Sequence, residues 1–319
     1  MMWSMSAPSM RTIRQQSLGG PEVLEVATVA RPEPPPTEVL VKIAAAGVNP
    51  VDWKTRSSGG RLGSPPFTVG WDVAGVVEEL GFGVTRFEVG DRVFGMPRFP
   101  REAAAYAEFV TSPSRQLARI PERLSDVEAA ALPLASLTAW QALVDTAAVG
   151  RDDRVLIQAA AGGVGHLAVQ IAKGRGAYVI GTARADEHAF LADLGIDEAI
   201  DYTRENVAAT VRDVDVVLDL VGGQTGLDSL PVVRDGGLLI SVPSRGDVAP
   251  LREAATGRVH VTGILVEPDR TGMEAIAALA ADGKLRVRVS RTFPLEQTAA
   301  AHELGENGRA GGKLVLTID

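Results

Sequence analysis

The pattern of hydrophobic and polar positions changes twice along the chain. Up to about residue 121, short apolar runs of strand length are separated by Gly, Pro and Asn, which is typical of a β-rich domain. From about residue 126 to 266, strand-like runs alternate with apolar residues at helical spacing, as in a parallel sheet flanked by helices. The pattern predicts an α/β protein, with a doubly wound parallel sheet in residues 126–266 and a β-rich domain made of residues 1–125 and 267–319.

The most informative segment runs from Val155 to Lys173 and reads VLIQAAAGGVGHLAVQIAK. An apolar run meets a glycine turn and then a helix with one apolar face. Glycines at a helix N-terminus let backbone N–H groups approach a pyrophosphate, and the helix dipole favours the anion. Ala160 replaces the first glycine of G-x-G-x-x-G, so a tight turn without a ligand is the alternative. The predicted contacts with a dinucleotide are Ala161, Gly162, Gly163, Val164 and Gly165.

A second apolar run, Ala177 to Ala183, ends where a nucleotide-binding sheet reads the adenosine ribose. The polar side chains there are Thr182 and Arg184. A carboxylate would bind the 2′-hydroxyl of NAD, whereas an arginine and a hydroxyl suit the 2′-phosphate of NADP. Asp186 lies at a similar distance but is explained more simply as an acidic helix start. We therefore predict NADPH as the cofactor, with a solvated surface charge as the alternative for Arg184.

Composition narrows the classes of partner. The chain has 319 residues, 45% hydrophobic, which suits two domains with sizeable cores. A net charge of −8 offers no basic face for nucleic acid, and no apolar run is long enough to span a bilayer. The first residues lack a basic start followed by an apolar stretch, and there is no cysteine. We expect a cytoplasmic protein with neither nucleic acid nor membrane as a partner.

Four runs of sequence carry a family resemblance: Ala46 to Gly59, Gly70 to Gly95, Leu132 to Leu143, and the glycine loop with its helix. Through them the chain resembles the medium-chain dehydrogenase/reductase superfamily, and within it the zinc-free quinone oxidoreductase branch. The resemblance implies a GroES-like catalytic domain split around a Rossmann domain. It also implies a homodimer joined through edge strands, for which residues 259–266 (VHVTGILV) are the candidate here.

The residues that bind zinc in related dehydrogenases are missing. Catalytic zinc needs thiolate, imidazole or carboxylate ligands. Asn49 stands where the zinc enzymes carry their first cysteine, and Trp71 where they carry a histidine. Asp72 remains beside Trp71, but a lone carboxylate makes no zinc site. The histidines show no ligand spacing, so we predict no metal.

Without a Lewis acid, the chemistry that remains is direct hydride transfer to an electrophilic acceptor such as a quinone or an enone. Donors near the nicotinamide would stabilise the charge that develops on the acceptor oxygen. Asn49, at the position that faces the nicotinamide in the family, is the candidate donor, although a turn residue before Pro50 fits equally. Asp52 and Lys54 are candidates that would shape the site or relay a proton. The alternative is a structural ion pair or solvated surface charges. Trp71 is a candidate wall for a flat substrate, with core packing as the alternative.

The resemblance implies further cofactor contacts, at the nicotinamide end, near the 2′-phosphate and at the carboxyl ends of strands. The alternative at the nicotinamide end is a helix residue that hydrogen-bonds its own backbone. The alternative near the 2′-phosphate is a half-buried strand aromatic, and at the strand ends it is plain strand termination at Gly and Pro. The candidates are Thr138, Tyr202, Val221, Gly222, Val242 and Pro243, with Arg309 as a further phosphate contact.

Three functions fit these patterns. The first is an NADPH-dependent reductase of quinones or other activated carbonyls and alkenes. The second is an enoyl or alkenal double-bond reductase with a narrow substrate, and the third is a non-catalytic NADPH-binding or sensor protein. We favour the first, and cofactor turnover separates it from the third.

Overall fold

The computed structural model describes residues 8–243, 245–308 and 310–319. The chain folds as two compact units. Unit 1 comprises Met1–Leu134, Glu267–Asp282 and Val287–Asp319, and unit 2 comprises Ala135–Val266 and Gly283–Arg286. The division between them falls within helix α3 (Pro133–Trp140), whereas the predicted division after residue 125 precedes helix α2 (Asp126–Ala130).

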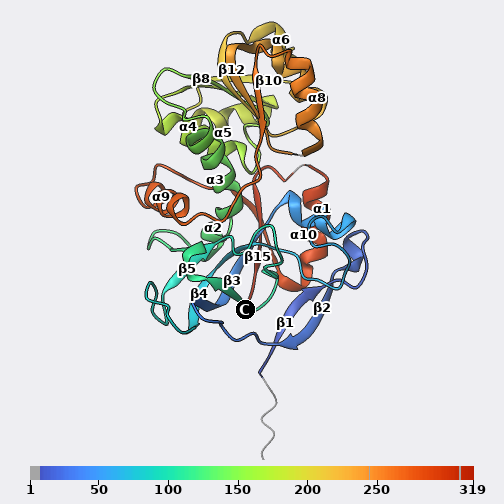
Figure 1. The fold of residues 1–319 in the computed structure, drawn as a ribbon, viewed down its shortest axis with the longest axis vertical. Helices are drawn as coiled ribbons and strands as arrows, with labels where there is room; N and C mark the ends of the chain where they lie inside the picture. The colour runs from blue at the N-terminus through green and yellow to red at the C-terminus, as the bar shows by residue number, and fades with distance from the viewer. Residues whose placement is uncertain (1–7, 244, 309) are drawn as a thin grey trace, which may run out of the picture. The chain divides into compact units, whose positions relative to one another are not determined.

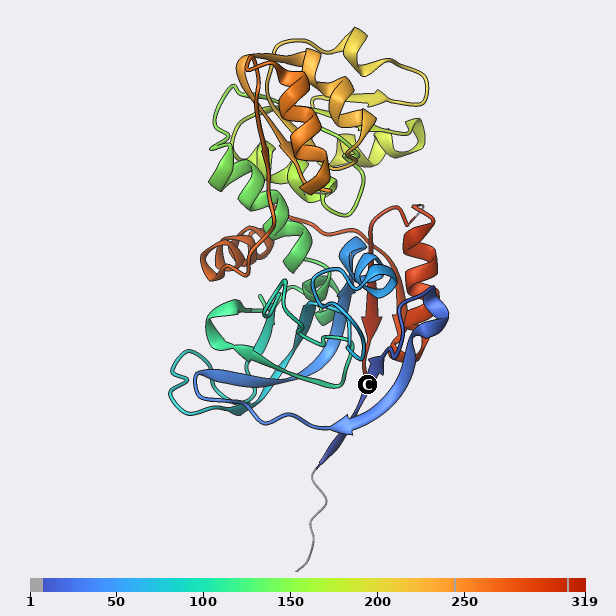
Figure 2. The same ribbon diagram turned by 45° about the vertical axis from the view of Figure 1, so that its right-hand side comes forward.

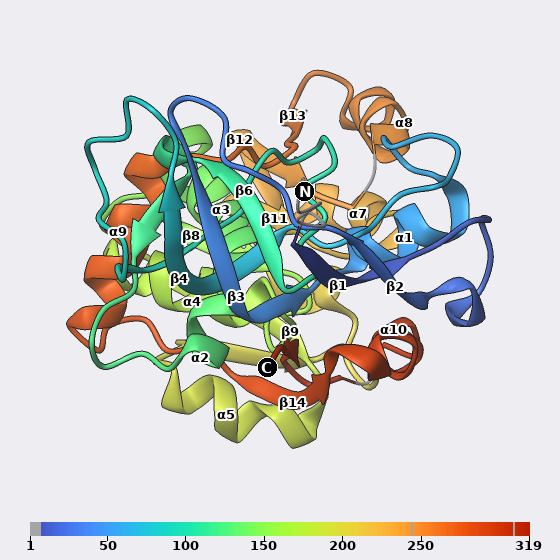
Figure 3. The same ribbon diagram turned by 90° about the horizontal axis from the view of Figure 1, so that it is seen from below.

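Unit 1 contains a seven-stranded sheet and a separate two-stranded ribbon (Figures 1 and 3). The large sheet has the order β14-β15-β3-β4-β5-β7, with β6 also paired to β3, and the ribbon pairs β1 with β2. The strands are β1 (Ser9–Arg14), β2 (Glu25–Ala30), β3 (Glu38–Val48), β4 (Asp72–Leu80), β5 (Arg92–Gly95), β6 (Phe109–Pro113), β7 (Leu117–Arg119), β14 (Val289–Pro294) and β15 (Lys313–Thr317). The helices, besides α2, are α1 (Pro50–Ser58), α9 (Arg270–Ala281) and α10 (Thr298–Glu306).

Strand β3 lies at the centre of this sheet. It pairs antiparallel with β4, β6 and β15, so most of its side chains are buried in the core of unit 1. In the pairing with β15, Val48 lies opposite Leu314. This register places Lys313, the first residue of β15, beside Asn49, which directly follows β3. In Figure 1, β15 is the red strand beside the blue β3.

Close packing of α2 fixes the end of β3. A Cβ built on Gly47 would lie 2.4 Å from the Ala130 carbonyl oxygen and 2.9 Å from the Asp72 carboxylate. Only glycine lets three segments approach this closely. Gly47 therefore lets the end of β3 lie against both the start of β4 and the end of α2, and the buried Asp72 lies at this meeting point.

Unit 2 is a six-stranded parallel sheet, and all six predicted strands are present. The strand order is β10-β9-β8-β11-β12-β13, so the direction of winding reverses between β8 and β11. Such a switch point is where parallel sheets of this class bind dinucleotides. The strands are β8 (Arg154–Ile157), β9 (Tyr178–Ala183), β10 (Glu198–Asp201), β11 (Val214–Asp219), β12 (Val233–Ser241) and β13 (His260–Gly263).

The helices of unit 2 bury the apolar runs of these strands, with α8 packed beside β13 (Figure 2). Helix α4 follows the glycine loop as predicted, but residues 165–172 are all buried, rather than one face alone. Outside the predicted apolar face, Gln170 exchanges hydrogen bonds with the backbone of Arg286, and His166 lies against Phe190. After α3 the helices are α4 (Gly165–Gly174), α5 (His188–Asp193), α6 (Val207–Thr210), α7 (Gln224–Ser229) and α8 (Arg245–Ala255).

Within the described ranges, every helix is too short or too polar to cross a membrane.

Candidate functional site

The glycine loop of unit 2 connects β8 to α4 at the switch point of the sheet. A Cβ on Gly165 would lie 2.2 Å from the Ala159 carbonyl oxygen, so α4 packs against the loop without room for a side chain. This is the helix packing role of the last glycine in the dinucleotide fingerprint. A Cβ on Gly162 would lie 3.1 Å from the same oxygen, which is also a tight contact. The loop therefore has the close backbone geometry that the sequence predicts.

The amide groups at this helix start are available to a ligand. In the described structure, the N–H groups of Gly163, Val164 and Gly165 have no hydrogen-bond acceptor within the chain. Unpaired N–H groups at the positive end of a helix dipole form an anion site. The donor set thus fits the pyrophosphate of a dinucleotide.

Thr182 lies beneath the loop instead of at its surface. Its hydroxyl donates to Gln158 Oε1 at 2.7 Å and accepts from the Ala159 amide at 3.0 Å, and the residue is buried. These bonds tie the end of β9 to the loop after β8. A contact between Thr182 and the 2′-phosphate stays a prediction, and this geometry makes Thr182 a support of the loop.

Arg184 and Tyr202 lie side by side at the ends of neighbouring strands. Ala183 pairs with Asp201 in the parallel register of β9 and β10, which brings the next residues together. Arg184 Nε donates to Tyr202 Oη at 3.4 Å, and both side chains are exposed. The bond to Tyr202 raises the pKa of the Arg184 guanidinium above its usual value, so this group is a permanent cation beside a phenol. The pair places two exposed polar groups at the ends of β9 and β10.

On the other side of the switch point, the loop after β11 carries predicted cofactor residues. Asp219 Oδ1 accepts hydrogen bonds from the amides of Val221 (3.0 Å) and Gly222 (2.8 Å). Val242 follows β12, and its amide donates to the Asp219 carbonyl at 3.0 Å. Pro243 continues this segment and is half-buried, as is Val242. Thr138 is buried on α3, and Arg309 lies outside the described residues.

Unit 1 holds a buried polar network around Asn49. Asn49 precedes α1, and its backbone N–H donates to Asp52 Oδ2 at 2.6 Å, closing the first turn of the helix. Its side-chain Nδ2 donates to Asp72 Oδ2 at 2.8 Å, while its Oδ1 accepts from Lys313 Nζ. The amide orientation of Asn49 is thus fixed from both ends. Two of the predicted residues, Asn49 and Asp52, lie together in this network.

Burial makes Asp52 an unusual carboxyl group. It is fully buried, and burial raises its pKa to about 7, against the opposing hydrogen bonds from Asn49 and Tyr106. Tyr106 Oη donates to Asp52 Oδ2 at 2.8 Å, whereas Oδ1 has no partner in the described structure. Burial, followed by the nearby Asp52 carboxylate, raises the pKa of Tyr106 well above 10. Asp52 can therefore hold a proton near neutral pH.

Asp72 and Lys313 are the buried ion pair of this network. Lys313 Nζ lies 3.8 Å from Asp72 Oδ2 and donates to the Val48 carbonyl at 3.2 Å. Burial raises the pKa of Asp72 to about 6 and lowers that of Lys313, while their mutual attraction opposes both shifts. The Leu134 amide donates to Asp72 Oδ1 at 2.8 Å, so both carboxylate oxygens are bonded.

The other two candidates of unit 1 lie apart from this network. Trp71 is buried, donates from Nε1 to the Arg101 carbonyl at 2.7 Å and contacts Phe99 edge to face, as a core residue does. Lys54 is exposed on α1. Their proposed roles toward a substrate stay predictions.

Sequence reasoning missed four of the groups that complete these sites: Tyr106, Asp219, Ser241 and Lys313. The available signals were weak. Lys313 is a charged residue at the start of the last apolar run, and Asp219 interrupts the apolar run VVLDLVGG. Lys313 lies 264 positions from Asn49, so spacing could not identify it, and Asp219 lies close to Val221 and Gly222 but without a motif that marks its role. Ser241 and Tyr106 carry no pattern of their own.

Among the residues that the structure describes, no group of three or more His, Cys, Asp and Glu side chains is placed to hold a metal ion.

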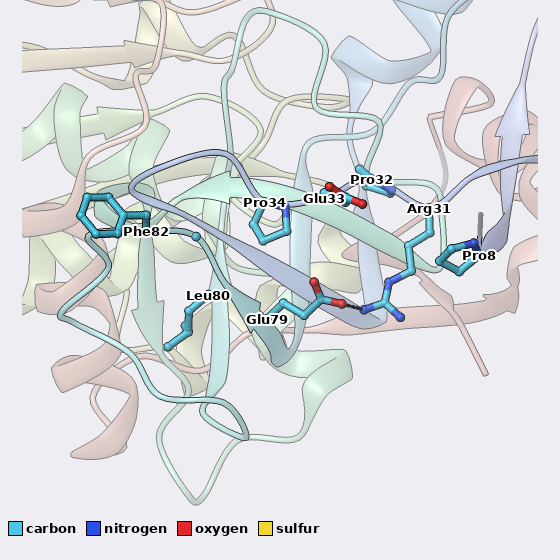
Figure 4. Close-up of a pocket in the computed structure, with 9 residues that line it drawn as sticks. Pro8, Arg31, Pro32, Glu33, Pro34, Glu79, Leu80 and Phe82 are labelled. Carbon is cyan, nitrogen blue, oxygen red and sulfur yellow. Dashed lines mark hydrogen bonds and ion pairs between the residues drawn. The ribbon is translucent and has the colours of Figure 1, made fainter. Parts of the chain in front are cut away.

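A surface pocket of about 320 Å³ lies in unit 1 between Pro8 at one end and Phe82 at the other (Figure 4). Its Arg31 pairs with Glu79, and it holds none of the candidate residues, so it is separate from the proposed chemistry.

Comparison with known proteins gives a consistent result. A family model described as the alcohol dehydrogenase GroES-like domain matches residues 35–122, and one described as zinc-binding dehydrogenase matches residues 194–316. The quinone oxidoreductase of Homo sapiens is 32% identical, over 97% of this chain and 98% of the relative. The structure of the quinone oxidoreductase from Coxiella burnetii superposes with a TM-score of 0.93 at 37% identity, covering 98% of this chain and 100% of the other. The Escherichia coli quinone oxidoreductase complexed with NADPH gives a TM-score of 0.86 at 29% identity, with 96% and 99% covered.

Proposed function

This chain belongs to the zinc-free quinone oxidoreductase branch of the medium-chain dehydrogenase/reductase superfamily, and we propose that it transfers a hydride from NADPH to a quinone or another activated carbonyl or alkene. Membership of this family makes it an oxidoreductase that uses a nicotinamide cofactor. The choice of NADPH and the class of acceptor are the proposed parts. The observation that carries the proposal is the Arg184–Tyr202 pair beside the glycine loop in a chain that matches quinone oxidoreductases along its length.

The donors of unit 2 fit the parts of NADPH. The N–H groups of Gly163, Val164 and Gly165 would hold the pyrophosphate, together with Ala161 and Gly162 of the same loop. The guanidinium of Arg184 and the hydroxyl of Tyr202 would hold the 2′-phosphate, because both are donors and both are exposed. A residue that accepted hydrogen bonds there would favour NADH instead. When bound, NADPH supplies the hydride, which reaches an acceptor that is already electrophilic.

Asn49 is the donor that we assign to the acceptor oxygen. An amide nitrogen carries two hydrogens, and Asp72 takes one of those on Asn49 Nδ2. The bond from Lys313 to Asn49 Oδ1 withdraws electron density from the amide, which makes the remaining N–H a stronger donor. A fixed donor stabilises the negative charge that develops on the acceptor oxygen in the transition state.

Reduction of a quinone to a hydroquinone consumes a proton as well as a hydride. Asp52 is suited to store it, because burial raises the pKa of its carboxyl to about 7 and Tyr106 anchors one oxygen. A group with a pKa near the working pH gives and takes protons most effectively. In this network, Asn49 would thus supply the hydrogen bond to the acceptor and Asp52 the proton.

The test is the loss of NADPH absorbance with the full chain in the presence of a chelator. NADPH and NADH are compared with a simple benzoquinone and with an α,β-unsaturated ketone as acceptors. We expect chelator-resistant turnover that prefers NADPH and the quinone. Faster reduction of the ketone would move the acceptor class to enones, and tight binding of NADPH without turnover of either acceptor would overturn the reductase.

A further inference from the structure

The carboxylate of Asp219 connects three segments at the carboxyl end of the sheet in unit 2. It ends β11 and is completely buried. Oδ1 accepts from the amides of Val221 and Gly222, the first residues of the predicted cofactor loop. Oδ2 accepts from Ser241 Oγ at 3.3 Å, and Ser241 is the last residue of β12. One side chain therefore sets the spacing between two neighbouring strand ends.

The space around this carboxylate is closed. A Cβ on Gly226, in α7, would lie 2.7 Å from Asp219 Oδ2. Helix α7 can approach only because residue 226 has no side chain, and it packs directly against the carboxylate. The bonds that Asp219 accepts come from neutral donors, and bonds from such donors to a charged acceptor are stronger than bonds between neutral groups. The loop after β11 is thus held by hydrogen bonds and close packing within the chain itself.

The position of Asp219 in the strand order indicates which part of the cofactor this arrangement would contact. In a doubly wound sheet each half receives one mononucleotide, with the pyrophosphate at the switch point between them. Arg184 and Tyr202, the proposed 2′-phosphate donors, directly follow β9 and β10, so β11 and β12 form the half for the nicotinamide. We propose that Asp219 is a positioning residue, which holds the Val221–Gly222 backbone and the end of β12 in the geometry that receives the nicotinamide half of the cofactor. This inference rests on the proposed function.

The test compares ligands that report on different halves of the cofactor. Binding of NADPH and of 2′-phospho-ADP-ribose, which lacks the nicotinamide, is measured by calorimetry for the wild type and Asp219→Ala. Asp219→Ala leaves two amides and a hydroxyl without their acceptor. We expect NADPH to bind about tenfold more weakly, as for loss of one charge-assisted hydrogen bond, and the fragment to bind within about twofold of the wild type. The kcat should fall together with NADPH affinity, because the ring is misplaced.

Two variants keep the test decisive if Asp219→Ala fails to fold. Asp219→Asn retains one acceptor oxygen for both amides, so it should recover most of the NADPH affinity. Ser241→Ala removes only the link to β12, and should lower kcat about threefold without changing fragment binding. Asp215→Ala is the matched control, since Asp215 lies at the opposite end of β11 and caps the Arg154 amide at 2.8 Å. It should lower the melting temperature and leave both ligands' affinities unchanged.

Each outcome has one meaning. Equal weakening of NADPH and fragment binding in Asp219→Ala, or no weakening of either, would overturn the positioning role. If Asp219→Ala does not fold, wild-type behaviour of both Asp219→Asn and Ser241→Ala toward kcat would overturn it as well. A wild-type chain that binds neither ligand would instead refute the proposed function, so the two failures are distinguishable.

Discussion

Lys313 and Asn49 are separated by 264 positions in the sequence, and they meet through a hydrogen bond from Lys313 Nζ to Asn49 Oδ1. The bond exists because β15 pairs with β3 in a register that sets the start of one strand beside the end of the other. It places a buried ammonium group next to two buried carboxyl groups, Asp52 and Asp72. The charge balance of the unit 1 network thus depends on a single lysine.

Replacement of this lysine should destabilise the protein strongly. Lys313→Met leaves Asn49 Oδ1 without a donor and the Asp72 carboxylate without its cation, and breaking a buried pair costs about 3 kcal/mol or more. The free energy of unfolding in urea measures the effect. Lys173→Met is the control, because its pair with Asp197 is partly exposed and should contribute about 1 kcal/mol or less. Equal losses in the two variants would contradict the account of the buried network.

The stability of the protein should depend on pH through Asp52. Its pKa is raised from 3.8 to about 7 in the folded state, so between these values the folded protein binds more protons than the unfolded chain. The stability contributed by Asp52 is then fully present below about pH 4 and is lost as the pH rises through about 7. Asp52→Asn cannot ionise. Relative to the wild type, its unfolding free energy should increase by about 2 kcal/mol between pH 5 and pH 8. A difference that stays constant over this range would show that Asp52 is ionised throughout.

Arg184 should determine the preference between NADPH and NADH. Arg184→Ala removes the permanent cation proposed for the 2′-phosphate, so the KM for NADPH should rise about tenfold while the KM for NADH stays unchanged. Tyr202→Phe should act in the same direction with a smaller effect. Arg204→Ala serves as the control, because Arg204 is an exposed arginine of the same region with a long contact of 3.7 Å to Asp201. An equal rise in the KM for NADPH and for NADH in Arg184→Ala would contradict the assignment of Arg184 to the 2′-phosphate.

The two ends of α4 should respond differently to the same substitution. Gly165→Ala places a Cβ 2.2 Å from the Ala159 carbonyl oxygen, which forces the helix away from the loop and should cost about 2 kcal/mol or more. NADPH binding should weaken as well. Gly174→Ala meets no atom within 4 Å and should be neutral or stabilising by up to about 1 kcal/mol. Thermal melts and NADPH titrations of both variants check this, and a tolerated Gly165→Ala would contradict the packing.

The parallel sheet and the glycine loop could be predicted because their signals are local. The order of apolar runs and turns predicted all six strands, and the glycines at the start of α4 predicted the loop between β8 and α4. The unit 1 network could not be predicted in the same way. Its members Asn49, Tyr106 and Lys313 come from three distant segments, and only the pairing of β3 with β15 and the fold of the intervening loops bring them together. The full burial of α4 was missed for a similar reason, since Gln170 and His166 are covered by Arg286 and Phe190, which lie outside the helix.

The pairing of β3 with β15 also constrains the order in which this protein can be assembled. A ribosome makes β3 early, and makes the partner strand only after all of β8 to β13 has been synthesised. The nascent sheet around β3 must therefore wait with one edge unpaired, while the six-stranded sheet of unit 2 has every strand it needs. Until Lys313 arrives, the Asp52 and Asp72 carboxyl groups have no buried cation beside them and Asn49 Oδ1 has no donor, so the polar network of unit 1 is completed last.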